Sequence, residues 1–161
     1  MIKLTVVSVI SLSMLMAGCG SDSSSSDDPT INTFEVIACP EVANNSTIKE
    51  SQIEIISSSH RFVELYLTSD LDSQQAEPII DFEKKSVIAI HLGEKASSGH
   101  QVRVTGVEDQ GARVMVNYEV IAPSEECAVD TGLTYPYCFI SIEKSTKTVD
   151  FNAINVARCI N

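Results

Sequence analysis

The sequence predicts a mainly β domain, with α+β character only in one short helix: a compact β-sandwich or half-open barrel, stapled by disulfides. Apolar and polar residues alternate in several short runs, which is typical of half-buried strands. Turn residues separate these runs at regular spacing. The chain also holds five cysteines, a content that suits an exported protein with disulfides. Residues 31–161 are long enough to bury a core, and we expect a single domain there.

Residues 1–18 are predicted to be a lipoprotein signal peptide. Lys3 supplies a positive charge, and the apolar run that follows is shorter than the about 20 residues that span a membrane. The run ends in Leu-Met-Ala-Gly-Cys, which resembles a bacterial lipobox, so we expect the lipid on Cys19. Ordinary secretion with Cys19 in a disulfide is the alternative, but the other four cysteines already form an even set.

Residues 19–30 are predicted to be a flexible tether, because serine and aspartate dominate them and little apolar surface could order them. Gly20 after the lipobox cysteine favours the outer membrane, with the periplasmic or surface face left open. The formal charge of the chain is −11, and removal of Lys3 with the signal makes it −12. Such acidity argues against nucleic acid as a partner and against a polybasic membrane-binding face. We therefore expect membrane contact through the lipid alone.

The first half of the domain is predicted to contain two strands and a helix. Residues 31–38 form a first strand with Phe34, Val36 and Ala38 on one face, and residues 52–56 form a short second strand. Residues 57–70 are ambiguous, because their composition suits a strand. However, Phe62, Leu65 and Tyr66 fall at helical spacing and the preceding serines offer an N-cap, so we predict a helix.

A hairpin with a presented loop is predicted at the centre of the chain. Residues 86–92 are apolar on both faces, as in an interior strand, whereas residues 101–107 alternate as a half-buried strand does. On the first strand Val87, Ala89 and His91 face one way and Ile88, Ile90 and Leu92 the other. Gly93 and Gly99 bracket the polar loop 93–100 and supply positive φ angles for its turns.

The last third is predicted to contain three strands joined by loops. Residues 112–122 alternate, with Val114, Val116 and Tyr118 on one face. Residues 139–144 and 147–151 are predicted to form a closing hairpin. In Tyr135-Pro136-Tyr137 the aromatic neighbours raise the chance of a cis proline, although the trans bond remains favoured.

An ordered series of small motifs carries a family resemblance. Asp81-Phe82 precedes the apolar strand, Gly93 and Ser98-Gly99 follow it, and Thr134-Tyr135-Pro136-Tyr137 comes later. In this order the motifs resemble the C-terminal domain of the PrcB family, over roughly residues 52–144. The resemblance implies a lipoprotein that stabilises a surface protease complex, and it also implies the helix at 57–70. Where the family tends to have a glycine and then an aromatic after the loop's hydroxyl, this chain has Gly99, His100 and Gln101.

The four remaining cysteines allow three disulfide pairings. We predict Cys127 with Cys138, which would close the loop that holds residues 134–137, and Cys39 with Cys159, which would tie the ends of the domain. A zinc site is the competing interpretation. The chain lacks a Cys-x-x-Cys spacing, and an oxidising compartment disfavours thiolates, so we expect no metal.

Sequence motifs for catalysis are weak. His60 falls in the first turn of the predicted helix, whereas His91 and His100 flank the loop and could converge on a metal or activate Ser97 or Ser98. No orienting aspartate stands at a recognisable spacing, and no nucleotide or phosphate motif is present. A hydrolase is therefore the third hypothesis, and we predict neither an enzyme nor a cofactor.

The function that we predict is a lipid-anchored, non-enzymatic protein-interaction module, whose partner the resemblance implies is a protease. Binding residues concentrate on loops held by a scaffold. The candidate contacts are Gly93, Ser97, Ser98, Gly99 and His100 in the first loop, and Thr134 and Tyr135 in the disulfide-framed loop 125–136. The alternative is a small β-domain protease inhibitor that presents loop 93–100 to an active-site cleft.

Overall fold

The computed structural model describes residues 30–31, 33–71 and 76–160. The predicted signal peptide, the lipidation residue Cys19 and nearly all of the predicted tether lie outside the described residues. Thr30, where the predicted tether ends, begins the first strand. Within the described ranges, no helix is long and apolar enough to cross a membrane.

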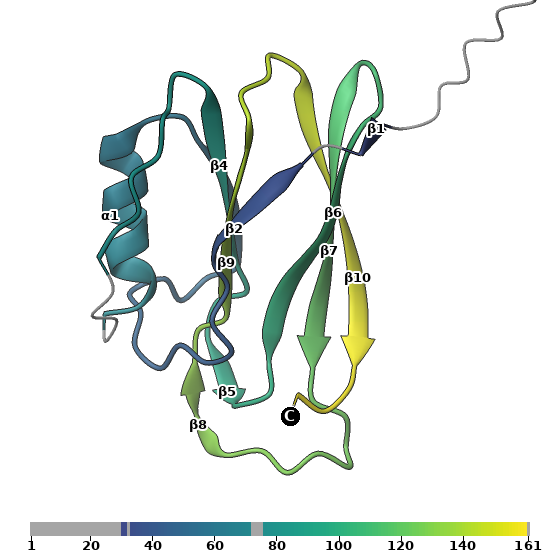
Figure 1. Cartoon of the computed structure of the whole chain (residues 1–161). Helices are drawn as coiled ribbons and strands as arrows, with labels where there is room; N and C mark the ends of the chain where they lie inside the picture. The colour runs from purple at the N-terminus through teal and green to yellow at the C-terminus, as the bar shows by residue number, and fades with distance from the viewer. Residues whose placement is uncertain (1–29, 32, 72–75, 161) are drawn as a thin grey trace, which may run out of the picture.

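Two four-stranded sheets face each other, and one helix covers the outer face of the second sheet (Figure 1). The first sheet has the order β1-β6-β7-β10, with β1 Thr30–Ile31, β6 Gln101–Asp109, β7 Arg113–Ala122 and β10 Thr148–Ala157. The second has the order β2-β9-β4-β3, with β2 Phe34–Ala38, β9 Tyr137–Glu143, β4 Lys85–His91 and β3 Gln52–Ile56. A separate ribbon pairs β5 Lys95–Ser97 with β8 Thr131–Thr134, and the helix is α1 Ser59–Ser69. This arrangement confirms the predicted β-sandwich with one short helix.

β4 is the interior strand that the sequence predicted. It lies between β3 and β9, and every residue from Ser86 to His91 is buried. Its two faces serve two cores. Ile88, Ile90 and Leu92 enter the core between the sheets, which we call the inter-sheet core. Val87 and Ala89 enter the core beneath α1, which we call the helix-side core.

The helix is confirmed, and its apolar spacing explains its position. Phe62, Leu65 and Tyr66 are at most 8% exposed and pack into the helix-side core. The Tyr66 ring meets Phe139 of β9 edge-on, with 5.6 Å between ring centroids. Ser58 occupies the N-cap position, although its side chain makes no capping hydrogen bond. Tertiary packing rather than capping therefore stabilises this helix.

Both predicted hairpins are wrong. β4 and β6 belong to different sheets, and so do β9 and β10, which runs parallel to β7. In each place the chain crosses from one sheet to the other because both strands bury apolar side chains in the same inter-sheet core from opposite sides. Alternation reveals which side chains face a core but not which sheet supplies the strand.

The prediction that Phe34, Val36 and Ala38 share one face of β2 is also wrong, because the strand contains a bulge. The register with β9 shifts between Val36 and Ala38, and Val36 is 59% exposed. Phe34 packs against the inter-sheet core, whereas Ile37 and Ala38 pack against the helix-side core. The extra residue turns the strand over, so Phe34 and Ala38 do not share a face.

All four expected cysteines form disulfides, but the predicted pairing is wrong: the bonds are Cys39–Cys138 and Cys127–Cys159. β2 lies antiparallel beside β9 with Ala38 opposite Phe139, which brings Cys39 next to Cys138. β7 and β10 run parallel and end side by side at Ala122 and Ala157, so the cysteines that follow the two ends meet. No described peptide bond is cis, so Pro136 is trans.

Candidate interaction site

The two loops predicted to bind a partner form one surface, at the lower end of the molecule in Figure 1. β5 and β8 pair antiparallel, and Thr134 Oγ1 donates a hydrogen bond to the Ser97 carbonyl at 2.9 Å. The Ser98 amide donates to the Asp130 carbonyl at 3.0 Å, and the Asp130 amide donates to Ser98 Oγ at 2.9 Å. We call residues 93–100 and 125–136 together the loop platform.

Three of the predicted contact residues lie beneath this surface. Thr134 and Tyr135 are 5% and 8% exposed, and Gly93 is buried. The Tyr135 amide donates to the Ala43 carbonyl at 2.8 Å, and its hydroxyl donates to Glu94 Oε2 at 3.0 Å. These residues hold the loop platform in place. Among the predicted residues, Ser97, Ser98, Gly99 and His100 remain partly exposed to a partner.

Gly93 has a φ of +72°, and a Cβ there would lie 2.6 Å from the Lys49 carbonyl oxygen. This position therefore requires glycine, both for the backbone angle and for the close approach of the 49–51 backbone. Gly99 has a φ of +84°, and a Cβ there would lie 3.1 Å from Pro123 Cβ and 3.2 Å from Val129 Cγ1. Both glycines that the sequence singled out are needed, for packing as well as for turns.

A hollow of about 180 Å³ opens beside Ser98 and Gly99. Its apolar lining comes from Val42, Pro123, Ala128, Val129 and Ile160. Glu41 and Asp130 add carboxylates to the lining, and no ion pair within the described ranges involves either of them. The hollow is smaller than the roughly 300–1,000 Å³ of typical small-molecule sites, and its size suits one protruding apolar side chain.

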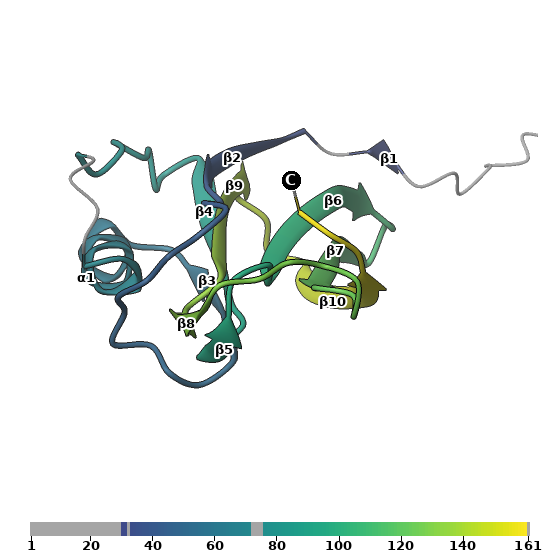
Figure 2. The same ribbon diagram turned by 90° about the horizontal axis from the view of Figure 1, so that it is seen from below.

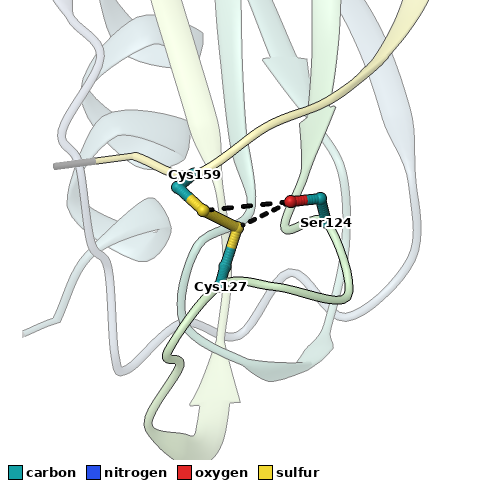
Figure 3. Close-up of a disulfide and its surroundings, with 3 residues drawn as sticks. All are labelled: Ser124, Cys127 and Cys159. Carbon is teal, nitrogen blue, oxygen red and sulfur yellow. Dashed lines mark hydrogen bonds between the residues drawn. A yellow bond between two sulfur atoms is a disulfide. The ribbon is translucent and has the colours of Figure 1, made fainter.

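The Cys127–Cys159 disulfide fastens the loop platform to the chain that follows β10 (Figure 3). Ser124 Oγ lies 3.0 Å from Cys127 Sγ and 3.8 Å from Cys159 Sγ. Cys159 is exposed, whereas Cys138 of the other disulfide is fully buried. Sequence reasoning missed Pro123 and Ser124 as parts of this site, because nothing in their spacing links them to the loop at Gly99.

His91 does not face the loop serines. It is 3% exposed in the helix-side core, where its Nε2 lies 2.8 Å from Ser69 Oγ. The Ser69 hydroxyl donates its one hydrogen to the Leu65 carbonyl at 2.6 Å. His91 Nε2 must therefore carry a hydrogen and donate to Ser69, which leaves Nδ1 as a buried acceptor without a partner.

Burial lowers the pKa of His91 to about 4, an effect that the negative charge of Glu54 partly opposes. The pKa of His100 is also lowered, by burial first and then by the positive charge of Lys95. Since His91 contacts Ser69 of α1, the hypothesis that it activates Ser97 or Ser98 gains no support. Among the residues that the structure describes, no group of three or more His, Cys, Asp or Glu side chains is placed to hold a metal.

These features define a class of protein: a small disulfide-linked β-sandwich with one covering helix and a loop surface at one end. Residues 86–143 match the family model described as PrcB C-terminal. This segment of the chain is therefore similar to the PrcB C-terminal family, which confirms the predicted resemblance. The matched segment runs from β4 to β9 and contains both loops of the platform.

An uncharacterized protein of Methanocaldococcus jannaschii is 30% identical over 60 residues. The match covers 37% of this chain and 36% of that protein, so the chain spans little more than a third of its relative's length. No solved structure matches the chain.

Proposed function

We propose that this protein is a lipid-anchored component of the bacterial cell envelope that binds a protease complex and stabilises it without catalysis. The family match supports association with a protease complex, because the name PrcB belongs to proteins of that kind and the matched residues include the whole loop platform. In this proposal Cys19 carries the lipid and residues 20–29 connect the outer membrane to the β domain.

The observation that carries the proposal is the joining of two loops, about 30 residues apart in sequence, into one preorganised surface. The β5–β8 pairing and the hydrogen bonds between Ser98 and Asp130 connect the loops to each other. The Cys127–Cys159 disulfide connects them to the first sheet. A surface that is ordered before binding loses less conformational entropy in a complex, and this favours affinity.

The chemistry of the hollow indicates the kind of contact. Val42 and Val129 are 48% and 38% exposed, so a partner's apolar side chain would remove both from water. Glu41 and Asp130 would attract a lysine or arginine next to that side chain. The preferred partner segment thus combines one apolar side chain with a neighbouring positive charge.

The inhibitor alternative receives less support from the geometry. An inhibitory loop projects into a cleft, but here Ser97 and Ser98 are bonded across to Thr134 and Asp130. The loop 93–100 is one half of a paired surface. A paired, preorganised surface suits stabilisation of a partner better than insertion into an active site.

Two matched variants of the full-length chain test the proposal. Leu133 on β8 and Leu67 on α1 are both 52% exposed, and they lie on different parts of the molecule (Figure 1). Leu133→Asp places a charge on the loop platform, whereas Leu67→Asp places the same charge on the helix. We expect Leu133→Asp to lower capture of the protease from detergent-solubilised envelope at least tenfold, equivalent to about 1.4 kcal/mol. Leu67→Asp should capture it as the unmodified chain does.

If the protein stabilises the protease, Leu133→Asp should shorten the lifetime of the protease in cells. If the protein were an inhibitor, the same substitution would instead raise the proteolytic activity. Equal capture by both variants, with circular dichroism confirming that both fold, would contradict the proposed surface.

Cys19→Ser tests the anchor separately: we expect it to move the protein from the membrane fraction to the soluble fraction. Retention in the membrane would contradict lipidation at Cys19.

A further inference from the structure

β10 presents a long, unprotected sheet edge. All ten of its residues pair with β7 on one side, and no other strand of the described chain pairs with its outer side. Asn152, Ala153, Ile154 and Asn155 are all exposed. The backbone amides and carbonyls that point away from β7 are therefore available to another strand.

The other strands at the sheet edges are protected in ways that β10 is not. β1 has two residues, and β2 is interrupted by a bulge. β3 has five residues, and its Glu54 is bonded to Arg61 at 2.7 Å. β10 contains no proline, glycine or lysine, and its single charged residue, Asp150, is already paired with Arg113 at 3.1 Å. Long neutral edges of this kind pair readily with another strand.

Two partly exposed apolar side chains of β3 lie on the same side of the sandwich as this edge. Figure 2 shows β3 and β10 on the same side of the sandwich, each at the end of its sheet. Ile53 and Ile55 lie opposite Ile90 and Ile88 in the β3–β4 register, so they face the space between the sheets. They nevertheless remain 38% and 45% exposed. A strand added beside β10 would extend the first sheet beneath these two side chains and reduce their contact with water.

We propose that the strand added to β10 is the β10 of a second copy of this chain, in an antiparallel arrangement with a two-fold axis at Ile154. The charges favour this partner and this register. Asp150 and Arg158 lie four residues on either side of Ile154, so each would stand opposite its counterpart of opposite sign in the other copy. Both lie on the face that carries Ile154, which is 50% exposed and would meet its own equivalent.

The pairing would place charges in alternation across the joined sheets. In each copy Arg113 is bonded to Asp150 and Glu119 to Arg158. Across the axis the charged side chains would then follow one another in this order: Arg113 and Asp150 of the first copy, then Arg158 and Glu119 of the second copy. No like charges are brought opposite each other, although the chain as a whole is strongly acidic. This inference goes beyond the proposed function and does not rest on it.

Cysteine cross-linking of the full-length chain tests the register. With Ile154→Cys, the two introduced thiols would face each other across the axis, and we expect a reducible dimer on a non-reducing gel. Leu67→Cys is the matched control, because Leu67 is 52% exposed on α1, away from the edge. Asn152→Cys tests the register itself, since residue 152 would stand opposite Val156. We expect Ile154→Cys to cross-link at least tenfold faster than either control.

A charge exchange tests the same contact without oxidation. Ile154→Lys and Ile154→Glu should each be monomeric by sedimentation, because like charges would meet at the axis. A mixture of the two should form a mixed dimer. A monomeric unmodified chain at all concentrations, or equal cross-linking at residues 154 and 67, would overturn the proposal. Cross-linking of residue 154 to a different protein would also overturn it and would assign the edge to a partner strand.

Discussion

The buried histidine makes the stability of the domain depend on pH. His91 donates from Nε2 to Ser69 and has a buried Nδ1 without a partner, so protonation would add a charge and an unbonded N–H to the helix-side core. The perturbation that isolates this effect is His91→Gln. Glutamine cannot ionise near neutral pH, and its amide can still donate to the Ser69 hydroxyl.

The magnitude follows from the two pKa values. The ordinary histidine pKa is 6.5 and the folded value is about 4, so the unfolded chain binds more protons between these limits. Stability therefore falls as the pH falls from 6.5 towards 4. The full difference corresponds to about 3 kcal/mol, and about 2 kcal/mol of it is lost by pH 5. The folded carboxylates with lowered pKa, such as Glu35 and Asp109, lose their contributions mainly at lower pH.

Urea unfolding at pH 7.5, 6 and 5, with the disulfides intact, measures this dependence. The chain contains no tryptophan, so far-ultraviolet circular dichroism is the suitable signal. His91→Gln will be less stable at pH 7.5, because it loses the ring contacts with Tyr137 and Phe139. The decisive quantity is the loss between pH 7.5 and 5, which we expect to be about 2 kcal/mol smaller in the variant. Equal losses would refute the reasoning. His100→Gln, measured alongside, accounts for the other histidine with a lowered pKa.

Two further changes test the frame of the loop platform. Gly93→Ala should cost about 2 kcal/mol or more in urea unfolding, because its Cβ would meet backbone atoms, whereas Gly111→Ala, with φ +78° and open space, should cost about 1 kcal/mol. Equal costs would contradict the close approach at residue 93. Under limited reduction, alkylation with mass spectrometry should find Cys127 and Cys159 modified before Cys138, because Cys159 is exposed and Cys138 is fully buried. Loss of the Cys127–Cys159 disulfide should lower the free energy of unfolding by about 3–4 kcal/mol, because the bond joins residues 32 positions apart. Simultaneous modification of all four cysteines would contradict this order of reduction.

Local periodicity was enough to predict the elements that lie at the centre of the fold. Alternation in residues 86–92 assigned Ile88 and Ile90 to one face and Val87 and Ala89 to the other, and the structure places these pairs in separate cores. Helical spacing likewise predicted α1. Both signals arise from side chains only a few residues apart, so they need no knowledge of distant pairings.

The connections between strands were beyond this kind of reasoning. A hairpin and a crossing between sheets have the same local pattern, and the difference depends on which distant strands compete for each edge. Bulges at Ile37 and Thr105 shift the alternation by one residue without a sequence signal. The disulfide pairing depended on the same topology and therefore shared its error.

The candidate site was predicted in part. The two loops were identified from their glycines, hydroxyls and flanking cysteines, but their mutual pairing was not. β5 and β8 have three and four residues, too few for a detectable alternation. The contact between Ser98 and Asp130 joins positions 32 residues apart. Thr134 and Tyr135 are buried because of that pairing. The pairing could not be foreseen from the sequence, so both residues were predicted to lie on the surface.

The topology itself explains why the loop platform exists. His91 at the end of β4 lies opposite Tyr137 at the start of β9, and Gln101 at the start of β6 lies opposite Ile121 near the end of β7. The two segments that connect these sheets, 92–100 and 123–136, therefore cross between the same two neighbouring ends. Segments confined in this way must run side by side, and they satisfy their backbone groups by pairing as β5 and β8. The position of the surface is thus fixed by the crossings, whereas its exposed side chains are free to determine which partner it binds.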